Sequence, residues 1–318
     1  MSKNHQMLFA AVLACATAGV SAQPFTHVKT VNGMPARMTH ATTDGNGGVY
    51  FAASSDDKVY FVPDLLDDAE TSYTVFEGGF GSGNSHGGAT WDGAKLYTGG
   101  KTNDTSSIFY KAVPAGGNPP TWTTNQGTPY SLSAVLSGPA AVGTNKIVVA
   151  QMSDGGLIFY TDNGSNLTAD NGTPISGGAP NSKSVAYDPV RGKIYVAAAG
   201  SNQTGGIQVF NSDGTAAGTL AGSQYIASVS TTLGDAEQGI RYQSIAIHPT
   251  NGLLAFSRNT GAAGTTGWVI WNLNTNTQLQ FIDLSDTPGG QLSGVAGTTG
   301  QNQAQGVTFF EKNGQVYL

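Results

Sequence analysis

Cysteine is almost absent from this chain, because the 318 residues contain only Cys15. A single cysteine excludes an internal disulfide, a cysteine-based metal site and Cys-x-x-Cys-His haem attachment. Charge is also scarce: charged residues make up 11% of the chain, and the formal net charge is −6. Lys and Arg form no cluster, so we expect no nucleic-acid partner, since phosphate contacts need concentrated positive charge.

Long apolar runs are missing after residue 22, so we expect no integral membrane segment. Residues 1–22 predict an export signal. A polar start containing Lys3 precedes an apolar stretch over residues 7–20, and Val20-Ser21-Ala22 offers small residues for cleavage before Gln23. The alternative is a lipoprotein signal with acylation of Cys15. Ordinary cleavage predicts a secreted or extracytoplasmic protein consisting of residues 23–318, without any cysteine.

Catalytic motifs are lacking too. There is no Gly-x-Ser-x-Gly elbow and no His-Glu-x-x-His helix. His40 and His86 occupy comparable places in adjacent repeats, but no third ligand accompanies them, and catalytic zinc usually takes three. The segment 44–47 lacks the downstream Glu of a calcium loop and fits a hairpin turn better. We therefore expect no metal and no cofactor.

What the chain does contain is a repeat. An apolar strand pattern recurs at intervals of 47 to 62 residues, anchored at Tyr50, Tyr97, Val148, Tyr195, Ala255 and Tyr317. A second pattern follows each of the first five, ending in Phe61, Tyr110, Tyr160, Phe210 and Trp271. Turn formers such as Asp92-Gly93 precede the first pattern. Self-similarity at about 50 residues, made of short strands and tight turns, is typical of a radial β repeat.

Each repeat can be written as four strands, a to d, with the first pattern on strand b and the second on strand c. The unit Tyr187-Asp188-Pro189, followed by Gly192-Lys193-Ile194-Tyr195-Val196, resembles bacterial extracytoplasmic β-propellers with NHL-like, YVTN-like or SMP-30-like repeats. The predicted fold is an all-β, six-bladed β-propeller over residues 23–318. The sixth repeat ends after its strand b, and residues 25–31 would close the ring as an outer strand, which leaves that blade one strand short.

Strand alternation places the a–b and c–d turns on one face and the more variable b–c and d–a loops on the other. The connections over residues 222–241 and 285–304 are the longest and should form one wall of the variable-loop face. Binding residues tend to lie on loops carried by a rigid scaffold, so we place any site at this mouth of the central channel. The candidate ligand-binding residues there are Arg37, His40, His86, Lys183, Arg241, Gln243 and Gln305.

These residues predict a non-enzymatic binding or surface-structural module whose partner is a polar small molecule, a glycan or a protein. The alternative is a metal-dependent lactonase, because SMP-30-like proteins hold a divalent cation at the channel mouth. That resemblance implies an N-terminal Glu ligand, and no Glu occurs between the leader and Glu70. We therefore assign no catalytic residue.

Overall fold

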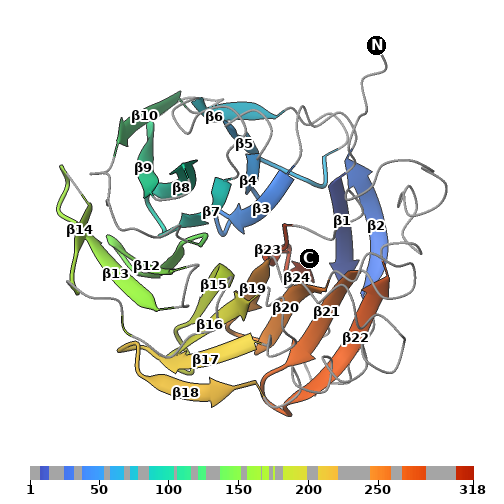
Figure 1. The fold of residues 1–318 in the computed structure, drawn as a ribbon. Coiled ribbons are helices and arrows are strands. Elements are labelled where there is room, and N and C mark those ends of the chain that lie inside the picture. Colours follow the sequence, from blue (N-terminus) through green and yellow to red (C-terminus); the bar gives the residue numbers. More distant parts are fainter. Residues whose placement is uncertain are drawn as a thin grey trace, which may run out of the picture.

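A computed structural model gives the fold of the chain (Figure 1). It describes residues 8–13, 25–31, 38–53, 58–67, 72–77, 86–103, 106–115, 121–126, 137–151, 156–165, 167–171, 175, 182–198, 207–220, 244–258, 267–283 and 306–318. All regular elements in these residues are β-strands, and they pair into four-stranded antiparallel sheets. The chain is an all-β propeller, as the repeat predicted.

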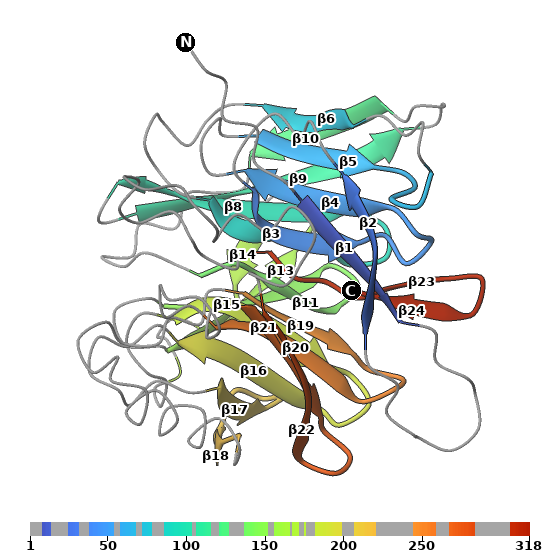
Figure 2. The ribbon, with the colours of Figure 1, turned by 90° about the vertical axis from the view of Figure 1, so that its right-hand side faces the viewer.

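Five blades each use four consecutive strands (Figures 1 and 2). Blade 1 consists of β3 (Met38–Thr43), β4 (Val49–Ala53), β5 (Lys58–Val62) and β6 (Tyr73–Glu77), and blade 2 of β7 (His86–Trp91), β8 (Leu96–Asn103), β9 (Ser106–Ala115) and β10 (Thr121–Gln126). Blade 3 consists of β11 (Ala140–Gly143), β12 (Lys146–Ala150), β13 (Leu157–Asp162) and β14 (Leu167–Ala169). Blade 4 consists of β15 (Ser182–Asp188), β16 (Lys193–Ala198), β17 (Ile207–Asn211) and β18 (Ala216–Thr219), and blade 5 of β19 (Ile245–His248), β20 (Leu253–Arg258), β21 (Gly267–Asn272) and β22 (Thr277–Asp283).

The sixth sheet combines the two ends of the chain. Its order is β2-β1-β24-β23, where β1 is Leu8–Leu13, β2 is Thr26–Val31, β23 is Phe310–Lys312 and β24 is Gln315–Tyr317. Strand β2 takes the outer place expected of residues 25–31. The missing strand is β1, which comes from the predicted export signal and pairs with both β2 and β24. The sequence did not predict this strand.

Apolar side chains fill the spaces between neighbouring sheets. The second and third strands supply most of them, because their residues alternate between the two sides of a blade. Phe61 packs between blades 1 and 2, Tyr160 between blades 2 and 3, Phe210 between blades 3 and 4, and Trp271 between blades 4 and 5. These four aromatics, which the sequence placed on strand c, thus lie between neighbouring blades. The side chain of Tyr110 lies outside the described residues.

The sixth sheet packs against both blades beside it. Phe310 and Tyr317 share a cluster with Val49 and Phe51 of blade 1. Their neighbours Phe309 and Val316 share another with Phe25 and with Ala255 and Ile270 of blade 5. Lys312 is also ion-paired with Asp64, which directly follows β5. The C-terminal hairpin therefore contacts blade 1 on one side and blade 5 on the other.

The a–b and c–d turns are short and begin with Asp or Asn side chains that accept backbone hydrogen bonds. Asp44 Oδ1 accepts from the N–H groups of Asn46 and Gly48 at 2.7 and 2.9 Å, and Asp92 Oδ1 accepts from those of Ala94 and Lys95 at 2.9 and 2.8 Å. Such turns let a short side chain replace a backbone partner. The segment 44–47 is accordingly a hairpin turn, as the sequence indicated.

The sequence pattern predicts the fourth strand of blade 4 at residues 219–221 and gives no candidate in blade 3. In the structure that strand ends at Thr219, and blade 3 has a short fourth strand at Leu167–Ala169. Both strands are short, three and four residues, so neither carries the apolar alternation over 4–8 residues that marks a strand in the sequence.

Candidate functional site

The strand directions confirm the assignment of faces. Because successive strands of each blade are antiparallel, the first strand of a blade begins at the face that carries the b–c and d–a connections. Figure 1 shows these first strands nearest the central axis. We call this end of the inner strands the mouth. From β18 to β19 the connection covers residues 220–244, and from β22 to β23 it covers residues 284–309.

The predicted mouth residues are described unequally. His40 is described with its side chain, whereas His86 and Lys183 are placed by their strands alone. Arg37, Arg241, Gln243 and Gln305 lie outside the described residues, as do most of the two long connections. The structure therefore brings His40, His86 and Lys183 to the mouth end of β3, β7 and β15.

A β-bulge recurs at the mouth. The register of the first strand slips between Met38 and His40 in blade 1, between His86 and Gly88 in blade 2, and between Ser182 and Ser184 in blade 4. The bulged residues, Thr39, Gly87 and Lys183, occupy equivalent positions, because their strands align through the Ala41–Phe51, Ala89–Thr98 and Val185–Val196 pairs. Bulges are common beside binding sites, where they re-aim a side chain.

This alignment corrects one expectation from the sequence. His40 and His86 are not equivalent: the residue that matches His40 is Gly88, and His86 lies two positions nearer the start of its strand. The a–b turns hide this offset, because the turn between the paired residues covers residues 44–48 in blade 1 but only residues 92–95 in blade 2.

Around His40 the inner strands approach closely. A Cβ on Gly88 would lie 2.9 Å from Gly138 Cα and 3.0 Å from His40 Cδ2, and Gly306 faces the backbone of His40. Gly88 also has a φ of +133°, a conformation that L side chains rarely adopt. Glycine is thus required where blades 1, 2 and 3 converge, beside the imidazole of His40.

Buried hydroxyl groups hold the inner strands at this level. Ser244 Oγ accepts a hydrogen bond from the N–H of Val307 at 2.9 Å, and Thr90 Oγ1 accepts one from the N–H of Ala141 at 3.0 Å. Each bond joins a blade to the next sheet. Within blade 3, Ser137 Oγ accepts a hydrogen bond from the N–H of Ala150 at 2.9 Å and holds the end of β12. These serines and threonines are structural, because their hydrogen bonds are made within the protein.

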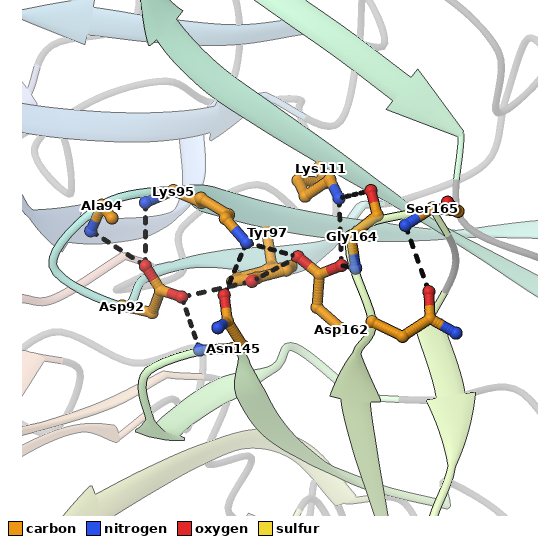
Figure 3. A network of polar contacts seen from close by, with 10 residues as sticks. Asp92, Ala94, Lys95, Tyr97, Lys111, Asn145, Asp162, Gly164 and Ser165 are labelled. Carbon is orange, nitrogen blue, oxygen red and sulfur yellow. Dashed lines mark hydrogen bonds and ion pairs between the residues drawn. The ribbon is translucent and has the colours of Figure 1, made fainter.

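On the opposite face, a polar network joins blades 2 and 3 (Figure 3). The carboxylate of Asp162, at the end of β13, accepts hydrogen bonds from Lys95 Nζ at 2.8 Å, Lys111 Nζ at 3.0 Å and the Tyr97 hydroxyl at 3.0 Å. The side chain of Asp162 is 1% exposed and that of Lys111 is 8% exposed. Asp92 extends the network, since its Oδ2 accepts from the N–H of Asn145 at 2.9 Å.

The electrostatics of this network favour the ionised carboxylate. Burial alone would raise the pKa of Asp162, but the hydrogen bonds from Lys95, Lys111, the Gly164 N–H and Tyr97 together lower its pKa well below the usual range. Burial, together with the charges of Asp92 and Asp162, raises the pKa of Tyr97 and keeps its hydroxyl protonated. Every charged group of the network thus has an internal partner, which makes it an inter-blade contact rather than a ligand site. The sequence analysis missed it.

Within the residues that the structure describes, no group of three or more His, Cys, Asp or Glu side chains could hold a metal ion. The same residues contain no helix long and apolar enough to cross a membrane. His248 ends β19 and places its Nε2 2.8 Å from Glu311 Oε1 in the sixth sheet. It therefore helps to join the sixth sheet to blade 5.

Comparison with known proteins supports the fold and nothing narrower. No family model and no curated protein matches the sequence. A chain of the nidogen–laminin complex superposes at a TM-score of 0.53 with 12% identity, over 87% of this chain and 92% of that one. A candidate 6-phosphogluconolactonase from Bacteroides uniformis superposes at 0.51 with 16% identity, over 83% and 74%.

Other similar structures are longer. The chain spans 33% of a prolyl endopeptidase chain and 63% of a chain in the mitotic checkpoint complex, at TM-scores of 0.44 and 0.45. A likeness of fold alone carries no activity with it. The likeness shows that the chain has the β-propeller fold, with distant similarity to lactonase-like and nidogen-complex propellers.

Proposed function

We propose that the chain is an exported, six-bladed β-propeller that binds a polar or anionic ligand at its mouth without catalysis. The recurrent bulge carries this proposal, because three blades break their inner strand at one level and blade 4 places Lys183 in the break. The two longest connections lead into the first strands β19 and β23, and Arg241, Gln243 and Gln305 shortly precede those strands in the sequence. Converging cations and amides on a rigid scaffold suit a glycan or an organic acid.

The opposite face supports the same choice. Its described lysines and arginines have internal partners: Lys95 and Lys111 bond Asp162, and Arg191 bonds Asp188 at 2.7 Å. A ligand there would have to displace these ion pairs, several of which are buried.

The six-bladed closed ring is the finer part of the proposal. Its support is the packing of the C-terminal hairpin against blades 1 and 5 at once. Ring closure can be tested by cross-linking two introduced cysteines, because the processed chain would contain no other cysteine. Asp64→Cys combined with Lys312→Cys should be cross-linked rapidly by a short bismaleimide. The control is Asp64→Cys combined with Lys193→Cys, because these two residues belong to blades 1 and 4 and should not be cross-linked. Equal labelling without cross-linking of the first pair would show an open ring.

Ligand binding is tested with a panel of glycans and organic acids, followed by calorimetry on the best ligand. Lys183→Ala and Arg241→Ala should weaken binding several-fold, and affinity should fall as salt rises, because exposed charges are screened. Lys146→Ala is the matched control, since Lys146 begins β12 on the opposite face and pairs with Asp170 at 2.9 Å. Wild-type affinity in both mouth variants would refute the site. Metal-dependent lactone hydrolysis would favour the enzymatic alternative.

A further inference from the structure

We propose that the processed protein has an open, one-strand slot in its sixth sheet, between β24 and β2, that accepts an extended apolar strand from a partner protein. The proposal rests on the export part of the proposed function, because it starts from the removal of residues 1–22. Strand β1, Leu8–Leu13, lies within those residues and is the strand that fills the slot in the unprocessed chain.

The pairing of β1 defines the slot. Val12 and Leu13 pair with Tyr317 and Val316 of β24 on one side, while residues 8–12 pair with residues 26–31 of β2 on the other. Both pairings are antiparallel. Removal of β1 therefore leaves two strand edges that face each other about 10 Å apart, which is two strand spacings. Unpaired backbone groups on such edges are templates for a further strand.

Strand β2 cannot simply move inward to close this gap. It is antiparallel to β1, and β1 is antiparallel to β24, so β2 runs parallel to β24 and would have to reverse to form the antiparallel pairing used in every other blade. Its start is also fixed. Phe25 is buried, its N–H donates to Gln280 Oε1 at 2.6 Å, and its carbonyl accepts from Gln280 Nε2 at 3.0 Å.

The surroundings determine the chemistry of the occupant. Tyr317 packs toward blade 1 and Val316 toward blade 5. Residues opposite each other on antiparallel strands share a face, so the occupant's successive side chains would enter both apolar clusters in turn. The slot thus selects a strand of about six residues that is apolar on both faces, uncharged and free of proline. The sequence of β1, LFAAVL, meets each condition.

The test uses the protein recovered after export and a synthetic peptide that carries residues 7–14 with flanking lysines for solubility. We expect saturable binding and a rise in melting temperature, since a ligand that binds only the folded state stabilises it. A peptide with Ala10→Pro and Val12→Pro should bind at least about tenfold more weakly, because proline removes backbone donors. Full-length protein with its leader retained should bind neither peptide, since β1 occupies the slot in cis.

The other possible outcomes of this test also support or refute the slot. If the processed protein is unfolded alone, restoration of its β-sheet circular dichroism by the wild-type peptide supports the slot. Absence of both binding and restoration overturns it. A dimer that the peptide does not dissociate would show that a second copy, rather than a partner strand, fills the slot. The proposal assumes that residues 1–22 are removed, and mass spectrometry of the exported protein tests this assumption independently of the ligand assays at the mouth. A chain that still begins at Met1 refutes processing.

Discussion

Lys111 Nζ lies 3.0 Å from Asp162 Oδ1, and the two residues are 51 positions apart, almost one repeat. The contact joins the third strand of blade 2 to the end of the third strand of blade 3. It lies in a nearly closed environment, since neither side chain is more than 8% exposed. The blades are therefore linked by an ion pair at the turn face as well as by apolar packing between the sheets.

Asp162→Asn should destabilise the protein by about 3–5 kcal/mol, because it leaves the buried Lys111 without its counter-charge. Chemical denaturation followed by circular dichroism measures the change. The matched control is Asp170→Asn, which breaks the exposed Lys146–Asp170 pair with side chains 45% and 32% exposed. That variant should lose at most about 1 kcal/mol. Similar losses in both variants would contradict the structural role of the network.

The contribution of Asp162 should depend on pH in a defined direction. Its folded-state pKa is lowered, so its stabilising effect is present above the unfolded value of about 3.9 and is lost as pH falls toward the folded value. The difference in unfolding free energy between wild type and Asp162→Asn should thus be constant from pH 7 to about 5 and shrink below about 4. A difference that grows on acidification would refute the assignment.

Trp271→Ala should lower stability by about 3–5 kcal/mol, the usual cost of truncating a buried aromatic side chain. Trp271 is 5% exposed, packs between blades 4 and 5, and donates a hydrogen bond from Nε1 to Asn276 Oδ1 at 3.2 Å. The control is Val190→Ala in an a–b turn, where the side chain is 68% exposed. Thermal melts of the two variants should differ clearly, and a wild-type melt for Trp271→Ala would refute the blade register.

Gly88→Ala should cost more than Gly93→Ala. Both glycines have positive φ, +133° and +100°, so both substitutions carry backbone strain of about 1–3 kcal/mol. Only Gly88 also lacks space for a methyl group, because Gly138 Cα would lie 2.9 Å from it, whereas nothing lies within 4 Å at Gly93. The difference between the two unfolding free energies measures how tightly the inner strands converge. Equal losses would mean that the inner strands can separate.

The blades could be predicted from the sequence because the strands and turns of each blade follow from residues that are close together in the chain. All six anchors of the first pattern lie on second strands, from Tyr50 on β4 to Tyr317 on β24. Apolar alternation and turn residues such as Asp92-Gly93 determine a hairpin without information from elsewhere in the chain. The outer strand at residues 26–31 was predicted for the same reason.

Other features depend on contacts that no local pattern encodes. The bulges at Thr39, Gly87 and Lys183 arise from pairing between strands. The pairing also shows that Gly88, rather than His86, matches His40, because the a–b turn covers residues 44–48 in blade 1 and only residues 92–95 in blade 2. The Asp162 network was missed although a signal existed: a charged residue follows shortly after a repeated aromatic in both Tyr110-Lys111 and Tyr160-Thr161-Asp162. Most of the predicted mouth residues lie outside the described residues, so the site remains a proposal.

The apolar cluster beside blade 1 contains Val49 and Phe51 from one end of the chain and Phe310 and Tyr317 from the other. During synthesis, blade 1 emerges first but cannot complete this packing until nearly the whole chain has been made. Its apolar side remains uncovered throughout translation, when a chain is most prone to misassociation. Completion of the first blade therefore waits for residues 310–317, so the folding of blade 1 is coupled to that of the sixth sheet.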